Sequence, residues 1–63
     1  MKLKEYRERA GLSQSELARA SGVSVRMIQH YEQGAKDINK AAVITVKQLA
    51  DAVGCKIEEL IEA

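Results

Sequence analysis

Four glycines divide this sequence into five short segments, and each segment has the apolar spacing of an α-helix. The glycines lie at positions 11, 22, 34 and 54. Glycine readily adopts the left-handed backbone conformation that ends many helices, so this arrangement predicts four helix ends. The chain contains no proline and only two aromatic residues. We therefore predict an all-α domain of five helices with a core of aliphatic side chains.

The length and the cysteine content indicate a single small domain. A chain of 63 residues is close to the lower limit at which one apolar core holds a fold without a metal, a disulfide or a second subunit. Cys55 is the only cysteine, which excludes an internal disulfide and favours a reducing cytoplasm. We expect no signal peptide and no membrane span, because no apolar run reaches about 18 residues.

Serine caps predict two short consecutive helices after a first helix over residues 2–10. Ser13 and Glu16 have the spacing of a capping box. In this arrangement each side chain accepts a hydrogen bond from the backbone amide of the other residue. The second helix is therefore predicted to begin at Gln14 and to end before Gly22.

A third helix is predicted after a turn of about three residues, and two more helices follow it. Ser24 is the expected cap of the third helix, which runs from Val25 to about Gln33. The fourth helix is predicted to start around residues 39–42, because apolar residues recur at positions 46, 49, 50 and 53. The last helix is predicted over residues 56–63.

Residues 14–33 resemble the helix-turn-helix of the phage repressor and Cro-like (XRE-type) transcriptional regulators of bacteria and phages. The resemblance covers essentially the whole chain, and the positions that carry it are Gln14, Ala18, Gly22, Ile28 and Tyr31. A small residue at position 18 lets two helices cross closely, and the turn needs the backbone freedom of Gly22. The resemblance implies a sequence-specific DNA-binding regulator whose third helix lies in the major groove. We expect a repressor rather than an activator, because occupying a promoter is sufficient for repression.

A rotation of 100° per residue separates the third helix into two arcs. The arc expected to face the core holds Met27, Ile28, Tyr31 and Glu32. The opposite arc, here called the exposed arc, holds Val25, Arg26, Gln29, His30 and Gln33. Arginine, glutamine and apolar side chains can each contact base edges in a major groove. The exposed arc is therefore the predicted DNA-contacting surface.

The predicted base-contacting residues are Gln14, Val25, Arg26, Gln29 and His30. The resemblance places three of them, Val25, Arg26 and His30, where related repressors contact bases. It places Gln14 where the second helix touches both a phosphate and a base. Arg26 is the strongest candidate, because a guanidinium matches two acceptors of guanine, and a solvated or phosphate-bound arginine is the alternative. Val25 could instead pack against the start of its own helix.

The single histidine does not indicate a catalytic or metal site. His30 has no cysteine, aspartate or histidine at ligand spacing, so a surface imidazole is the alternative to a base contact. The sequence also lacks a phosphate-binding loop and a pair of catalytic carboxylates. We predict no enzyme activity, no metal, no cofactor and no small-molecule ligand.

Polar residues around the third helix are expected to contact the phosphates of the DNA backbone. The predicted phosphate-contacting residues are Ser13, Ser24, Gln33, Lys36 and Lys40. Contacts of this kind position a protein on DNA and carry no sequence preference. For the two serines, a helix cap without any phosphate contact is an equal alternative.

Glu32 lies on the arc expected to be buried, and a buried carboxylate needs a partner of opposite charge. Arg7 is the candidate partner. The resemblance places an arginine and a glutamate at these two positions as an ion pair between the first and third helices. We interpret both as scaffold residues.

Residues 41–46 contain more apolar side chains than one helix face can bury. Val43 or Ile44 is therefore expected to be exposed, and could contact a second subunit. The family resemblance implies a homodimer on a near-palindromic operator, with two recognition helices about 34 Å apart.

The formal net charge of only +1 leaves a second function open. Residues 1–40 carry eight basic and five acidic side chains, whereas residues 41–63 carry two and four. We expect one basic and one acidic surface if the fold separates these two parts. The alternative is an antitoxin or adaptor-type protein-interaction module on the same fold, whose DNA binding is weak and secondary.

Overall fold

The computed structural model describes residues 2–61, which are helical with short connections and contain no strand. The elements are α1 (Lys2–Arg9), α2 (Gln14–Ser21), α3 (Val25–Gln33), the 3₁₀ helix η1 (Ile38–Lys40), α4 (Val43–Val53) and α5 (Ile57–Leu60). The predicted all-α fold with five α-helices is confirmed.

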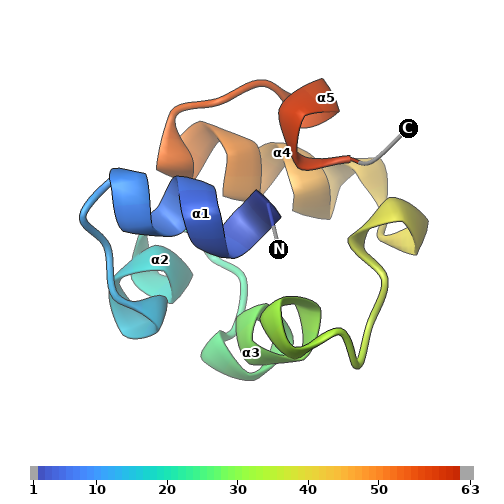
Figure 1. Cartoon of the computed structure of the whole chain (residues 1–63), viewed down its shortest axis with the longest axis horizontal. Coiled ribbons are helices and arrows are strands. Elements are labelled where there is room, and N and C mark those ends of the chain that lie inside the picture. Colours follow the sequence, from blue (N-terminus) through green and yellow to red (C-terminus); the bar gives the residue numbers. More distant parts are fainter. Residues whose placement is uncertain (1, 62–63) are drawn as a thin grey trace.

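The helices surround one aliphatic core. Figure 1 shows α1, α4 and α5 in the upper part of the molecule and α3 along its lower edge. Helix α2 packs against both α3 and α4, and α1 contacts α3, α4 and α5. The fully buried large side chains are Leu3, Leu17, Ile28, Val46, Leu49 and Leu60. Because α3 belongs to this core through one arc only, its other arc stays at the surface.

The turn between α2 and α3 forms as its residues predict. Gly22 has a φ of 77°, a left-handed conformation that a side chain would strain. Its amide donates a 2.9 Å hydrogen bond to the carbonyl of Ala18, which closes α2. The Ser24 hydroxyl accepts from the amide of Met27 at 3.2 Å and so starts α3. These local bonds hold the two helices in a helix-turn-helix arrangement.

The predicted start of the fourth helix, around residues 39–42, is wrong. The Asp37 carboxylate accepts from the amide of Asn39 at 2.9 Å and starts the separate 3₁₀ helix η1. Buried Ile38 anchors that turn in the core. Ala42 has an extended backbone, so α4 begins at Val43. Two side-chain features, the Asp37 bond and the burial of Ile38, outweigh the helical periodicity of the segment.

The last helix is shorter than predicted. Helix α5 ends at Leu60, and Ile61 has an extended backbone with φ −87° and ψ 131°. The rest of the predicted helix, residues 62–63, lies outside the described residues. The expected exposure at the start of α4 is present, since Val43 is 71% exposed and Ile44 is 61% exposed.

Candidate nucleic-acid interface

Helix α3 presents the two arcs that its sequence predicts. Ile28 is 0% and Tyr31 is 4% exposed, and both side chains lie in the core. On the exposed arc, Arg26 and Gln33 are exposed and Val25 is 37% exposed. Gln29 and His30 are half-buried. The five residues of the exposed arc therefore share one accessible surface on a helix that the core holds in place.

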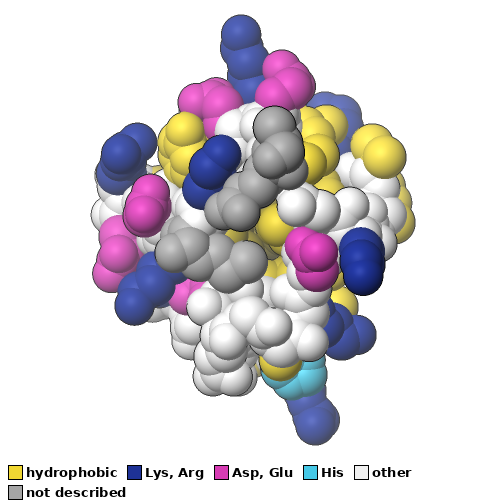
Figure 2. Space-filling view, turned by 45° about the vertical axis from the view of Figure 1, so that its right-hand side comes forward, with side chains coloured by type: hydrophobic (Ala, Val, Ile, Leu, Met, Phe, Trp, Pro, Cys, Tyr) yellow, Lys and Arg dark blue, Asp and Glu magenta, His cyan; other side chains and the backbone are white. Residues whose placement is uncertain are grey.

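The end of the molecule that carries α3 is mostly uncharged on the face in Figure 2, and its charged side chains there are basic. In Figure 2, acidic and basic side chains are mixed over the upper part of the face. The lower end shows basic side chains and the histidine, with no aspartate or glutamate. Helix α3 forms the lower edge in Figure 1, and Glu32 is its only acidic residue. A surface of this kind favours contact with a polyanion.

The ion pair expected between Arg7 and Glu32 is present. Arg7 Nε donates to Glu32 Oε2 at 2.7 Å, and Arg7 Nη2 donates to Glu32 Oε1 at 3.0 Å. The third donor, Arg7 Nη1, bonds the carbonyl of Leu12 at 2.9 Å. The side chains of Arg7 and Glu32 are 11% and 5% exposed. This bidentate pair joins α1 to α3 and neutralises the one acidic residue of α3.

The ion pair also lowers the pKa of the Glu32 carboxyl. Burial alone raises this pKa, but hydrogen bonds from Arg7 and Gln14 and the positive charge of Arg7 together bring it below the ordinary value of 4.5. A carboxyl with a lowered pKa in the folded state stabilises the fold at pH values above its unfolded pKa. That contribution is lost as the pH falls through the folded pKa.

We therefore expect the free energy of unfolding to fall as the pH drops below 4.5, and Glu32→Gln to make this acid decline shallower. A residual decline remains, because hydrogen bonds from the amides of Ser13 and Lys56 lower the pKa of Glu16 and Glu59. Urea unfolding at a series of pH values measures the effect. Glu5→Gln, at an exposed carboxylate on α1, is the control. An acid decline as steep in Glu32→Gln as in the unchanged chain would contradict the assignment.

A chain of side-chain hydrogen bonds runs from the ion pair to the exposed arc. Gln14 Nε2 donates to Glu32 Oε1 at 3.1 Å, and Gln29 Nε2 donates to Gln14 Oε1 at 3.5 Å. Sequence reasoning assigned both glutamines to base contact but missed their bonds to the scaffold. The only sequence signal was a glutamine at the start of one helix and a buried carboxylate in the next. Each carboxamide keeps a second N–H and a second lone pair for an outside group.

The imidazole of His30 has one atom that can contact a ligand. Its Nδ1 atom is buried without a hydrogen-bond partner among residues 2–61. A polar contact with another molecule would therefore use Nε2. The described residues contain no group of histidine, cysteine, aspartate and glutamate that could hold a metal ion.

The five residues predicted to contact phosphates lie near the ends of the two helices of the motif. The Ser13 hydroxyl accepts from the backbone amide of Glu16 at 3.1 Å and completes the predicted capping box. The Ser24 hydroxyl caps α3 by accepting from the backbone amide of Met27. Both hydroxyls keep a proton that can be donated. Gln33, Lys36 and Lys40 are exposed in and beyond the last turn of α3. The structure thus places polar groups at both ends of the exposed arc.

Comparison with known proteins identifies the family of the chain. A helix-turn-helix family model matches residues 3–60, a range that begins in α1 and reaches the end of α5. No curated protein and no solved structure matched the chain in the parallel searches. Among residues 2–61, no helix is long and apolar enough to cross a membrane. The chain therefore belongs to the XRE-type helix-turn-helix family of phage repressor- and Cro-like DNA-binding regulators.

Proposed function

We propose that this protein is a transcriptional repressor that binds duplex DNA sequence-specifically, with α3 in the major groove. The exposed arc of α3 carries the proposal, because it presents arginine, glutamine, histidine and valine side chains on a helix anchored by Ile28 and Tyr31. A major groove admits one α-helix and offers donors, acceptors and thymine methyls that match these groups. Occupation of a promoter by such a protein is sufficient for repression.

Each residue of the surface has a proposed role. Arg26 donates two hydrogen bonds to guanine O6 and N7, and Val25 contacts a thymine methyl. The other proposed base-contacting residues are Gln14, Gln29 and His30. The proposed phosphate-contacting residues are Ser13, Ser24, Gln33, Lys36 and Lys40. The side-chain amides of Gln14 and Gln29 are already oriented by hydrogen bonds, from Gln14 to Glu32 and from Gln29 to Gln14. This reduces the conformational entropy that the two side chains lose on binding.

The proposed assembly is a homodimer on a near-palindromic operator. The described part of one copy measures 25 × 22 × 19 Å. Two copies therefore fit side by side on one face of the duplex, with their α3 helices about 34 Å apart. The apolar pair Val43 and Ile44 at the start of α4 is proposed to contact the second copy, because the two exposed side chains are neighbours in the chain and contiguous exposed apolar surface is typical of interaction sites.

Selection from a random duplex library at moderate salt, followed by sequencing of the bound molecules, tests the proposed function. The expected result is an enriched motif made of two inverted half-sites. A single half-site would contradict the dimer and leave sequence-specific binding intact. Binding without any motif, and with a shallow dependence on salt, would contradict the repressor and favour the protein-interaction module.

Two single substitutions are expected to weaken DNA binding in different ways. Arg26→Ala should cost about 1–3 kcal/mol on the selected site and relax the preference at one base position. Lys40→Ala should weaken binding to all duplexes alike and lower the salt slope by about one. Fluorescence anisotropy on the selected site and on an unrelated duplex measures both. A uniform loss in Arg26→Ala would show that Arg26 contacts a phosphate instead of a base.

A further inference from the structure

A pocket of about 350 Å³ lies between α3 and the segment 36–41 that contains η1. Its lining residues are Met27, Tyr31, Lys36, Asp37, Lys40 and Ala41. Two ammonium groups, one carboxylate and one phenol therefore surround a single opening. The base and phosphate contacts proposed above give no role to Tyr31, which sequence reasoning assigned to the core.

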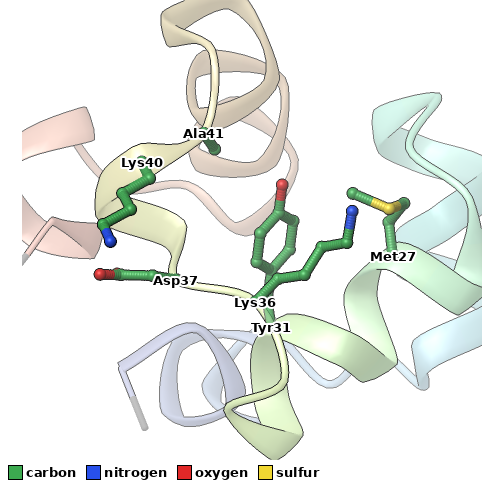
Figure 3. A pocket seen from close by; sticks show the side chains of 6 residues that line it. All are labelled: Met27, Tyr31, Lys36, Asp37, Lys40 and Ala41. Atoms are coloured by element: carbon green, nitrogen blue, oxygen red, sulfur yellow. The ribbon is translucent and has the colours of Figure 1, made fainter.

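The hydroxyl of Tyr31 makes no hydrogen bond within residues 2–61. Tyr31 is 4% exposed and its ring packs in the core. The hydroxyl oxygen is not among the fully buried polar atoms that lack a partner, so it reaches solvent at the mouth of the pocket, where a group from outside can replace water. Figure 3 shows the hydroxyl pointing toward Ala41, into the opening. Phenylalanine would fill the same core volume, so the hydroxyl is available for a group from outside.

The charged side chains of the pocket favour an anion at that hydroxyl. In Figure 3 the ammonium of Lys36 lies on the Met27 side of the Tyr31 ring. The end groups of Asp37 and Lys40 point to the opposite side of the view. In this view the Asp37 carboxylate and the Lys36 ammonium lie on opposite sides of the Tyr31 ring, and Lys36 lines the same pocket as the phenol. A hydroxyl donor next to an ammonium suits a phosphate oxygen, which accepts strong charge-assisted hydrogen bonds.

The position of the pocket on α3 indicates where that phosphate comes from. Met27 and Tyr31 directly follow Arg26 and His30, so the pocket borders the exposed arc on one side. Gln14, at the start of α2, contacts the other side of the arc through Gln29. A helix in a major groove has one phosphate backbone along each of its sides. When the exposed arc faces the base edges, the pocket faces one of these backbones.

We propose that this pocket binds a phosphate group, supplied by the DNA backbone. The Tyr31 hydroxyl donates a hydrogen bond to a phosphate oxygen, and the Lys36 ammonium provides the opposite charge. This inference rests on the proposed function, because the duplex is the source of the phosphate. It makes Tyr31 a residue with two roles, since its ring holds α3 in the core and its hydroxyl fixes the position of α3 on the backbone.

The test compares the affinity of the unchanged chain, Tyr31→Phe and Lys36→Gln for the selected duplex. Tyr31→Phe should weaken binding roughly three- to tenfold at every sequence, with the same thermal unfolding midpoint and salt slope. Lys36→Gln should weaken binding and lower the salt slope by about one. Tyr6→Phe, which removes a hydroxyl that donates to Glu59 at 2.8 Å, and Lys47→Gln, at an exposed lysine of α4, are the matched controls and should bind normally.

Duplexes with one neutral methylphosphonate at a time locate the contact. The expected result is one backbone position where the replacement weakens the unchanged chain but has little effect on Tyr31→Phe. Equal losses in both proteins at every position, or normal binding by Tyr31→Phe, would overturn this inference and leave the proposed function standing.

A titration with inorganic phosphate tests whether the pocket takes free phosphate instead of a phosphate of the DNA backbone. If the chain bound no duplex, the proposed function would fail. An NMR titration with inorganic phosphate would then decide whether the pocket binds a phosphate group. Shifts of the Tyr31 ring signals that disappear in Lys36→Gln would support a phosphate site that takes the free anion. Unshifted ring signals would overturn the site altogether.

Discussion

Replacing Arg7 by alanine is expected to lower the free energy of unfolding by about 3 kcal/mol, because the Glu32 carboxylate then stays buried without its partner. The carboxylate is 5% exposed and receives two of its hydrogen bonds from Arg7. A domain of 63 residues has a total stability of about 3–9 kcal/mol. The variant should therefore be substantially unfolded at moderate temperature, as measured by urea unfolding with circular dichroism.

The exposed ion pair of α4 is the control for this prediction. Lys47 and Asp51 are separated by 3.1 Å, and their side chains are 57% and 66% exposed. Lys47→Ala should therefore cost less than about 1 kcal/mol. The double variant Arg7→Met with Glu32→Leu should recover most of the loss, because it leaves no buried charge. If Arg7→Ala were no more harmful than Lys47→Ala, the pair would not be the link between α1 and α3.

Leu17→Ala is expected to have an effect of similar or larger size. Leu17 is 0% exposed and belongs to α2, the helix that packs against both α3 and α4. Truncation of a fully buried leucine costs about 3–5 kcal/mol through lost burial and the cavity left behind. The loss approaches the whole stability expected for this domain, so the helix-turn-helix should unfold.

Gln48→Ala is the control for Leu17→Ala, because Gln48 is an exposed residue of α4 to which no contact is assigned. It should change the free energy of unfolding by less than about 0.5 kcal/mol. Thermal and urea unfolding of both variants measure the difference. A loss below about 1 kcal/mol in Leu17→Ala would mean that α2 contributes little to the core, contrary to the packing described above.

The fold was predictable where local chemistry and apolar spacing agree. The Ser13 capping box and the Ser24 cap act within four residues of the chain, and the left-handed turn at Gly22 needs no distant contact. The burial of Ile28 and Tyr31 follows from helical rotation alone. These features specify the helix-turn-helix, and so the surface that it exposes.

The segment after α3 was not predictable in the same way. Its side chains satisfy helical periodicity, but the bond from the amide of Asn39 to Asp37 and the burial of Ile38 select a separate 3₁₀ turn. Burial depends on the distant helices that cover a residue, which periodicity does not describe. The pocket beside Tyr31 was missed for the same reason, because it exists only where η1 folds back next to α3.

The candidate site was predictable as a set of residues but not as a network. The exposed arc follows from the rotation of α3, and the resemblance to the family added Gln14. The hydrogen bonds from Gln14 to Glu32 and from Gln29 to Gln14 join residues that are 18 and 15 positions apart. Contacts at that separation depend on how α2 and α3 cross. A sequence pattern does not predict the relative position of two helices accurately enough to identify a hydrogen bond between them.

The most direct test of the central claim, that α3 contacts base edges in the major groove, replaces each guanine of the selected duplex in turn by 7-deazaguanine. This base pairs normally but lacks the N7 acceptor that an arginine contacts in the major groove. Affinities are measured for the unchanged chain and for Arg26→Ala. The account predicts one guanine at which the replacement weakens the unchanged chain by about 1 kcal/mol and leaves Arg26→Ala unaffected. Equal losses in both proteins at every guanine, or no loss at any guanine, would contradict it.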